Sequence, residues 1–192
     1  RRDVDADCRD RAALDRAAAA LRDAETLWAS PARRCRQTCA ALALTPEYHP
    51  ALWEQDFGRW EEPGAEIPDL GPLPPTELAA HRPPGGESFL DMCARVQPLL
   101  DQARGVTAIV AHAGTARAAL ALVVGPAALS FAIAPLSLTI LHRHAGGWAV
   151  EVHPQAASMR WAGFPYRLDE LGGTVRAAHD DVRFDLHGRH GE

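Results

Sequence analysis

The sequence lacks the dense basic runs, long apolar runs and paired cysteines by which several classes of protein are recognised. Its 192 residues carry a formal net charge of −5 and no dense run of lysine or arginine, which argues against a nucleic-acid-binding surface. No apolar stretch reaches the roughly 18 residues that span a bilayer, and no signal peptide is recognisable. We therefore expect neither nucleic-acid nor membrane partners.

Cysteines and histidines are present, but not at the spacings that predict disulfides or metal sites. The four cysteines (Cys8, Cys35, Cys39 and Cys93) include no CxxC pair, so we expect reduced thiols in a cytoplasmic protein. Six of the nine histidines lie at or beyond residue 142. Their irregular spacing, without a cysteine partner, argues against a zinc site.

The composition is that of a globular protein with one large domain. Of the 192 residues 47% are hydrophobic and 23% charged, so the chain is long enough to bury a substantial core. Neither repeats nor a linker occur before residue 153. We predict a domain over residues 1–152, followed by a loosely packed tail, residues 153–192, in which only residues 182–186 have a strand-like pattern.

The spacing of apolar residues and helix caps predicts the order of helices and strands in the first domain. Helices are expected from Asp7 or Asp10 to about residue 22, from a Ser30 N-cap to about residue 42, and from a Ser88 N-cap to about residue 100. Pro31 would take the first position of the second helix. Short strands are expected at residues 26–29, within 44–50, and at 106–111, 136–142 and 148–152.

The stretch around His112 has the pattern of a buried strand that leads through a tight turn into a helix. An apolar run from Val106 ends at His112, and an alanine-rich helical segment follows at once. Ligands of α/β proteins bind where strand ends and helix N-termini meet. The amides of Gly114, Thr115 and Ala116 would point into that space, which suits an anion such as phosphate. A neutral histidine that merely caps the turn is the other interpretation.

Two further stretches mix carboxylates with residues that do not fit a regular element. Residues 52–61 place Glu54, Asp56 and Glu61 among two tryptophans and a phenylalanine, and apolar surroundings raise carboxyl pKa values as a general acid requires. A packed loop with solvated acids is the plainer interpretation. Residues 63–84 contain seven prolines and predict an irregular excursion with a short helix at 76–81, which ends at Gly85-Gly86-Glu87-Ser88.

Four blocks in this order resemble the histidine phosphatase superfamily, the phosphoglycerate-mutase-like group, and most of all its bacterial branch near alpha-ribazole phosphatase. The blocks are Trp28-Ala-Ser-Pro-Ala-Arg-Arg34-Cys-Arg-Gln-Thr38, Leu52-Trp-Glu54-Gln-Asp-Phe-Gly-Arg-Trp-Glu61, Gly85-Gly-Glu-Ser88 and His112-Ala-Gly-Thr-Ala-Arg117. The resemblance implies a three-layer α/β sandwich with a mostly parallel central sheet. It also implies catalysis through a phosphohistidine, with no metal and no organic cofactor.

The resemblance also implies roles for individual residues. Arg34 matches the arginine that binds phosphate, for which a planar guanidinium is suited. His112 matches the histidine that donates a hydrogen bond to the transferring group, and Glu54 matches the acid that protonates the leaving oxygen. We expect Glu87 to orient the pocket and Arg117 to be structural, and we expect the neighbouring arginines of the first block to be solvated; these are Arg33 and Arg36.

One block of the family is absent from its expected place. Family members carry the nucleophilic histidine in an Arg-His-Gly or Arg-His-Ala block at the end of a first strand, and nothing before Asp3 fits it. One hypothesis is that this first strand is missing from the N-terminus. The other is circular permutation, in which residues 182–188 fill the strand position beside His112 and Arg189-His190-Gly191 supply the nucleophile.

The predicted function is hydrolysis of a small phosphorylated metabolite through a phosphohistidine, with Arg34, Glu54 and His112 in the site, by a monomer or homodimer. One alternative is an inactive relative that binds a phosphorylated ligand or a protein partner. Another is a mutase, although mutases usually need a longer enclosing insertion than residues 63–84 offer.

Overall fold

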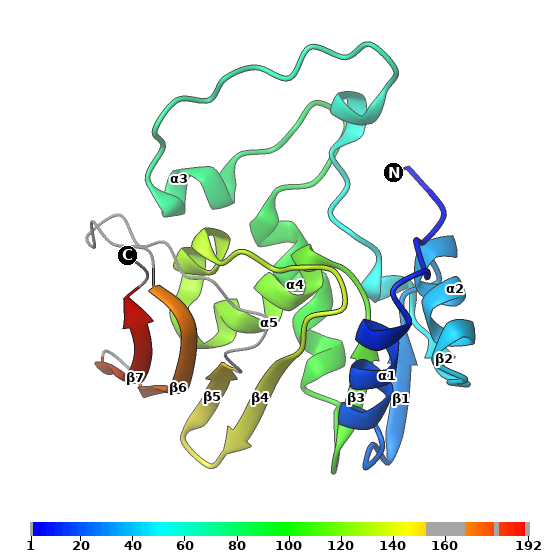
Figure 1. Cartoon of the computed structure of the whole chain (residues 1–192). Helices are drawn as coiled ribbons and strands as arrows, with labels where there is room; N and C mark the ends of the chain where they lie inside the picture. Colours follow the sequence, from blue (N-terminus) through cyan, green and yellow to red (C-terminus); the bar gives the residue numbers. More distant parts are fainter. Residues whose placement is uncertain (1, 153–167, 179–180, 191–192) are drawn as a thin grey trace.

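The structure is a computed structural model that describes residues 2–152, 168–178 and 181–190 (Figure 1). Its helices and strands follow one another as α1 (Arg11–Ala20), β1 (Thr26–Ala29), α2 (Arg33–Ala41), β2 (Glu47–Tyr48), η1 (Pro50–Leu52), η2 (Gly58–Glu61), α3 (Pro75–Ala80), α4 (Phe89–Leu100), β3 (Thr107–Val110), α5 (Ala113–Val124), η3 (Gly125–Ser130), β4 (Thr139–His144), β5 (Gly147–Val152), β6 (Leu168–Ala178) and β7 (Asp181–His190), where η marks a short 3₁₀ helix.

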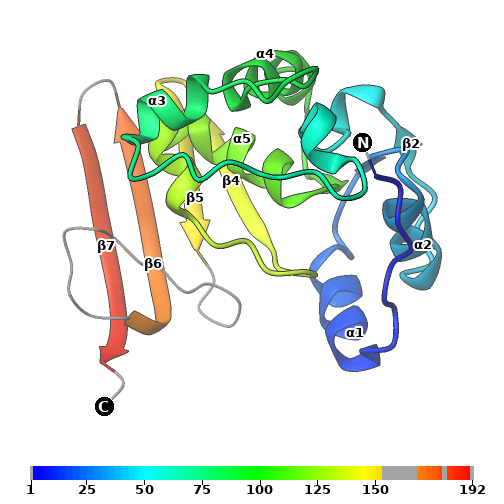
Figure 2. The same ribbon diagram turned by 90° about the horizontal axis from the view of Figure 1, so that it is seen from above.

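The strands form two sheets of different kinds. One is parallel, with the order β2-β1-β3 and with Leu27 of β1 opposite Ala108 of β3. The other is antiparallel, with the order β4-β5-β6-β7. Figure 2 shows α1, α2 and β2 at one end of the molecule and β6 and β7 at the other, with β4, β5 and α5 between them. The mixed α/β class with a parallel sheet, as predicted from the sequence, is confirmed.

Among the described residues, β3 has β1 as its one strand neighbour. Residues 182–188 do not lie beside β3, because β7 pairs with β6 at the outer edge of the second sheet, with Phe184 opposite Val175. The permutation hypothesis, which placed residues 182–188 next to the His112 strand, is therefore wrong.

The main core lies between α4 and α5. Apolar residues three or four positions apart give α4 a buried face, which packs against the apolar side of α5. Met92 and Val96 are fully buried, and Leu120 of α5 is 2% exposed. From the sequence we expected no apolar stretch long enough to span a bilayer, and this expectation is corrected. Residues 113–130, which comprise α5 and η3, form a helical stretch that is long and apolar enough to cross a membrane by length and composition alone. Core packing accounts for the same apolar positions.

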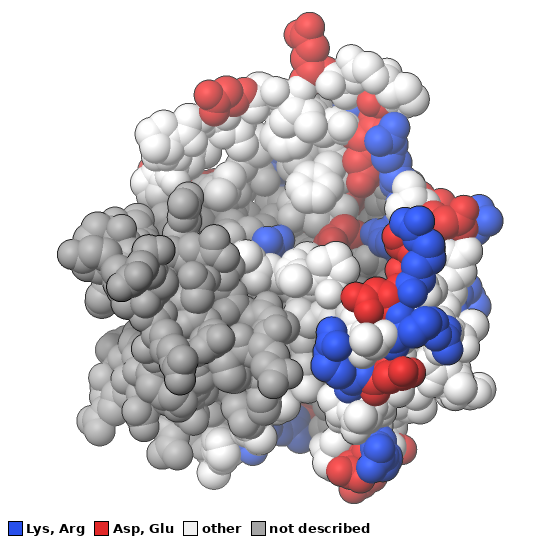
Figure 3. Space-filling model, viewed as in Figure 1, with Lys and Arg blue, Asp and Glu red and all other residues white. Residues whose placement is uncertain are grey.

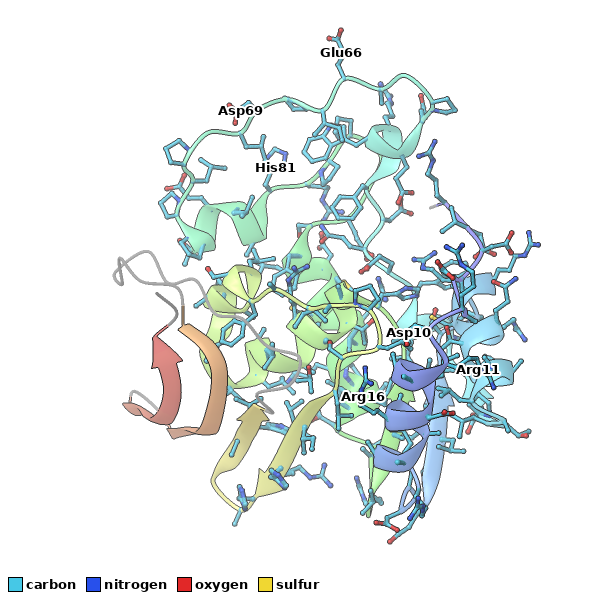
Figure 4. All side chains as sticks on the ribbon, in the orientation of Figure 1. Asp10, Arg11, Arg16, Glu66, Asp69 and His81 are labelled. Atoms are coloured by element: carbon cyan, nitrogen blue, oxygen red, sulfur yellow. The ribbon has the colours of Figure 1, made fainter. Side chains whose placement is uncertain are left out.

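Two of the three predicted helix caps occur as expected, and the third does not. The Asp10 side chain accepts a hydrogen bond from the Ala13 amide at the start of α1 (labelled in Figure 4), and Ser88 forms a reciprocal capping box with Asp91 on α4. Helix α2 instead begins at Arg33, after Ala32. Ser30 lies before it and is fully buried, which leaves its hydroxyl for the contacts described below.

The tail contains more regular structure than the sequence predicted. We expected one strand-like segment in a loosely packed tail, whereas β6 and β7 form a long antiparallel pair that extends the β4-β5 hairpin. Residues 153–167 lie outside the described residues. The domain boundary near residue 152 stays a prediction.

Candidate active site

His112 stands at the junction of β3 and α5, as its position in the sequence predicts. It is the N-cap of α5, and it is only 9% exposed. Its Nε2 lies 2.8 Å from the hydroxyl of Ser30, the residue that follows the end of the neighbouring strand β1. Both residues thus lie at the carboxyl edge of the parallel sheet, where side chains from different strands converge.

The Ser30 hydroxyl links the imidazole of His112 to the start of α2. Ser30 Oγ accepts a hydrogen bond from the Ala32 amide at 3.3 Å, and a hydroxyl can in addition either donate to His112 Nε2 or accept from it, according to the protonation of the ring. Because this contact fixes one edge of the imidazole, Ser30 orients the ring. Nothing in the local Ser-Pro pattern, which is typical of a helix N-cap, distinguishes this role from capping.

Cys35 also packs against the imidazole. Its Sγ lies 3.7 Å from His112 Nε2 and 3.9 Å from Nδ1, and it donates to the Ala111 carbonyl at 3.7 Å. Burial raises the Cys35 pKa to about 11, although the positive charge of Arg34 acts in the opposite direction. The thiol is therefore protonated at neutral pH and is a poor nucleophile.

Arg34 precedes Cys35 on α2 and is partly exposed, with its Nη1 donating to the Arg2 carbonyl at 3.1 Å. The two neighbouring arginines have other partners. Arg33 forms a 2.8 Å ion pair with Asp5, and the Arg36 guanidinium lies 3.9 Å from the centre of the Tyr48 ring. Of the three, Arg34 is the one whose charge acts on Cys35, which contacts His112.

Glu54 reaches the same place from the loop between η1 and η2. Its Oε1 accepts from the Gln55 amide at 3.0 Å, and its Oε2 accepts from the Gly114 amide at 3.4 Å. A carboxylate at a helix N-terminus is favoured by the helix dipole. A Cβ on Gly114 would collide with Glu54 Oε1. Glu54 therefore lies against the first turn of α5, at a residue two positions after His112.

This arrangement corrects the prediction for two of the three amides that were expected to face an anion, those of Gly114 and Ala116. The Gly114 amide already donates to Glu54, and the Ala116 amide donates to the His112 carbonyl within the helix. An anion bound here would have to share the Gly114 amide with the Glu54 carboxylate. The site is thus shaped by side chains as much as by the helix terminus.

Glu87 contacts the Glu54 loop. Its carboxylate accepts from the Asp56 amide at 3.0 Å and from the Arg95 guanidinium at 2.6 and 3.0 Å. Sequence reasoning missed Arg95. The one signal was its spacing, since it lies eight residues after Glu87, about two helical turns along α4.

Two glycines let the Glu54 loop and the Gly-Gly-Glu-Ser turn cross at close range. Gly58 has a φ of +55°, and a Cβ there would collide with the Pro84 carbonyl, while a Cβ on Gly86 would collide with the Asp56 carbonyl. Backbone hydrogen bonds join the two segments, from Arg59 to Pro84 and from Glu87 to Asp56. Only glycine fits where two backbones approach this closely.

The proline-rich excursion arches over this end of the molecule (Figure 1). Figure 4 shows Glu66 pointing outward from the arch, and Asp69 Oδ1 accepts a hydrogen bond from the Gly71 amide at 2.9 Å. His81, at the end of α3, stacks on Trp60 with 5.4 Å between ring centres. This stack ties the two ends of the excursion together.

Other charged residues have structural partners. Arg117 donates to the Phe131 carbonyl at 2.9 Å, a contact that joins α5 to the end of η3. Figure 3 shows Arg and Asp side chains interleaved over the side formed by α1, α2 and the N-terminal segment, and few charges over the excursion. Within the described residues, no three His, Cys, Asp or Glu side chains are grouped so as to hold a metal ion.

Comparison with known proteins places this geometry in a family. The chain is similar to the structure of TTHB049 from Thermus thermophilus, at 27% identity over 63% of this chain and 71% of that one, with a TM-score of 0.52. It has the fold of the Rv3214 product of Mycobacterium tuberculosis, at 21% identity over 79% and 84% of the two chains, with a TM-score of 0.60. A search of curated proteins finds no significant match. The sequence profile of the histidine phosphatase superfamily (branch 1) matches residues 2–155, and the chain belongs to that superfamily.

Proposed function

We propose that this protein hydrolyses the phosphomonoester of a small metabolite through a phosphohistidine intermediate. The observation that supports this most is that Glu54 binds the Gly114 amide two positions after His112, the N-cap of α5, while Cys35 of the helix that carries Arg34 contacts the His112 ring. A hydrogen-bond donor, a carboxyl group and a nearby guanidinium are the groups that phosphoryl transfer needs.

Each residue has a defined task in the proposed reaction. The nucleophile is a neutral imidazole other than His112, which forms a bond to phosphorus in line with the ester oxygen while the bond from phosphorus to that oxygen breaks. Arg34 and protonated His112 balance the charge on the equatorial phosphoryl oxygens. Protonated Glu54 gives its proton to the departing alkoxide, then takes a proton from the water that attacks the phosphohistidine and releases inorganic phosphate.

Trapping the phosphoenzyme tests this proposal. We expect the protein joined to a first strand that carries the family's Arg-His block to hydrolyse small phosphate esters. After incubation with a labelled ester and a quench in base, that protein should carry acid-labile label, and the 192-residue chain without the block should carry none. Peptide mapping then identifies the labelled histidine. The absence of both hydrolysis and label, in a protein that still binds inorganic phosphate, would contradict the proposal. It would support the alternative of an inactive relative that binds phosphorylated ligands.

The substrate class is a separate part of the proposal. Within the family, the likeness of the sequence blocks to the alpha-ribazole phosphatase branch favours a nucleoside-like monophosphate ester. We expect higher kcat/KM for ribosyl monophosphates than for glycerol phosphate. Equal values would leave hydrolysis as proposed and remove the assignment to that branch.

A further inference from the structure

Arg95 makes more contacts with the Glu54 loop than core packing requires of a helix residue. Its Nη1 donates to the Ala51 carbonyl at 2.6 Å, and its Nη2 donates to the Glu54 carbonyl at 3.2 Å. The same guanidinium holds the Glu87 carboxylate with two hydrogen bonds. The Arg95 side chain thus forms hydrogen bonds to both ends of the turn made by residues 51–54.

These contacts are shielded from solvent. The side chains of Arg95 and Glu87 are 23% and 15% exposed, so the ion pair is stronger and less screened than one on the surface. Glu87 is itself bonded to the Asp56 amide, and Gln55 Nε2 donates to the Glu87 carbonyl. The loop is therefore held to α4 on both sides of Glu54.

We propose that Arg95 is a positioning residue that sets where the Glu54 carboxylate lies at the first turn of α5. The catalytic role of Glu54 rests on the proposed function, whereas the effect of Arg95 on the position of the Glu54 carboxylate can be tested without any activity. A planar guanidinium can reach the two carbonyls and the carboxylate at once, whereas a lysine ammonium has one donor centre and cannot span them. Geometry, rather than charge alone, is thus what Arg95 contributes.

A second arginine that contacts α4 provides a matched control. Arg82 forms a 2.6 Å ion pair with Asp91 on α4 and donates to the Gly86 carbonyl at 3.4 Å. Its contacts tie the excursion to α4, but none of these is to residues 51–56. Arg95→Lys and Arg82→Lys therefore make the same chemical change, and only the first removes contacts to the Glu54 loop.

The first test reads the position of Glu54 directly and needs no activity. The Gly114 amide donates to Glu54 Oε2, so its NMR signal reports that contact. We expect the signal to shift in Arg95→Lys in the same direction as in Glu54→Gln, and to stay in place in Arg82→Lys. An unchanged signal in folded Arg95→Lys would overturn the proposal. Arg95→Gln, which keeps one amide donor on a shorter, uncharged side chain, serves if the lysine variant does not fold.

The second test reads the consequence for the reaction. Arg95→Lys should lower kcat/KM about tenfold or more for an alkyl phosphate, because a small misplacement of a catalytic group is costly, and far less for p-nitrophenyl phosphate. In the Glu54→Gln background the same change should have little further effect. If Arg95→Lys lowered kcat/KM equally for both esters, the positioning role of Arg95 would be overturned. Hydrolysis by the wild type would still support the proposed function. An inactive wild type would remove the proposed function and leave the NMR test decisive.

Discussion

At the scale of single residues, the site depends on contacts between positions far apart in the sequence. Ser30 and His112 are 82 positions apart and Glu54 and Gly114 are 60 apart. Family resemblance supplied Arg34, Glu54 and His112, each of which sits in a recognisable block. Ser30 and Arg95 could not be found in this way, because their roles arise from tertiary contacts that no local pattern encodes.

Replacement of Glu54 by glutamine tests its role as an acid. The amide is nearly isosteric but cannot supply a proton, so we expect kcat for alkyl phosphates to fall by about 10²–10⁴-fold. The loss should be much smaller for p-nitrophenyl phosphate, whose leaving group needs little protonation. Steady-state kinetics on both esters, with inorganic phosphate as a competitive ligand, check this. An equal loss on both would exclude Glu54 as the proton donor.

At the scale of elements, the sequence predicted those helices and strands whose formation depends on neighbouring residues. The strand at residues 26–29 and the Asp10 and Ser88 caps occur as expected, because apolar spacing and side-chain caps act within a few residues. The β6-β7 pair was not expected, since two strands that stabilise each other leave only a weak pattern in each alone.

The first turn of α5 offers a test of how an element serves the site. Gly114→Ala should be tolerated by the helix, where alanine is favoured over glycine by about 1 kcal/mol. The added Cβ would nevertheless collide with the Glu54 carboxylate. We expect near-normal thermal stability together with a loss of activity that follows the same leaving-group pattern as Glu54→Gln. Normal kinetics in the alanine variant would show that Glu54 need not lie against Gly114 during the reaction.

The capping box of α4 offers a second test at this scale. Ser88 Oγ accepts from the Asp91 amide, while the Asp91 carboxylate accepts from the Ser88 amide. Ser88→Ala should lower the free energy of unfolding by about 1 kcal/mol, measured by urea denaturation. Ser88→Gly should cost less, because glycine is a better N-cap than alanine. The reverse order would argue that the serine acts through packing rather than through capping.

At the scale of the whole molecule, three thiols make stability depend on alkaline pH. Burial is the largest cause that raises the pKa of Cys35, Cys39 and Cys93, each to about 11 from an ordinary value of 9.0. Within the described residues, which include all four cysteines, none forms a disulfide. Above about pH 9 the unfolded chain loses these protons first, so it binds fewer protons than the folded state and the free energy of unfolding falls as pH rises.

We therefore expect stability from these thiols to be fully present below about pH 9 and lost progressively toward about pH 11, by about 2 kcal/mol for each thiol. Urea denaturation of the wild type at about pH 8 and about pH 10.5 measures the fall, and the Cys35→Ala/Cys39→Ala double variant is the control. Because the substitutions themselves change the starting stability, the comparison is between the two slopes with pH. If the free energy of unfolding of the double variant fell as steeply with pH as that of the wild type, groups other than Cys35 and Cys39 would govern alkaline unfolding.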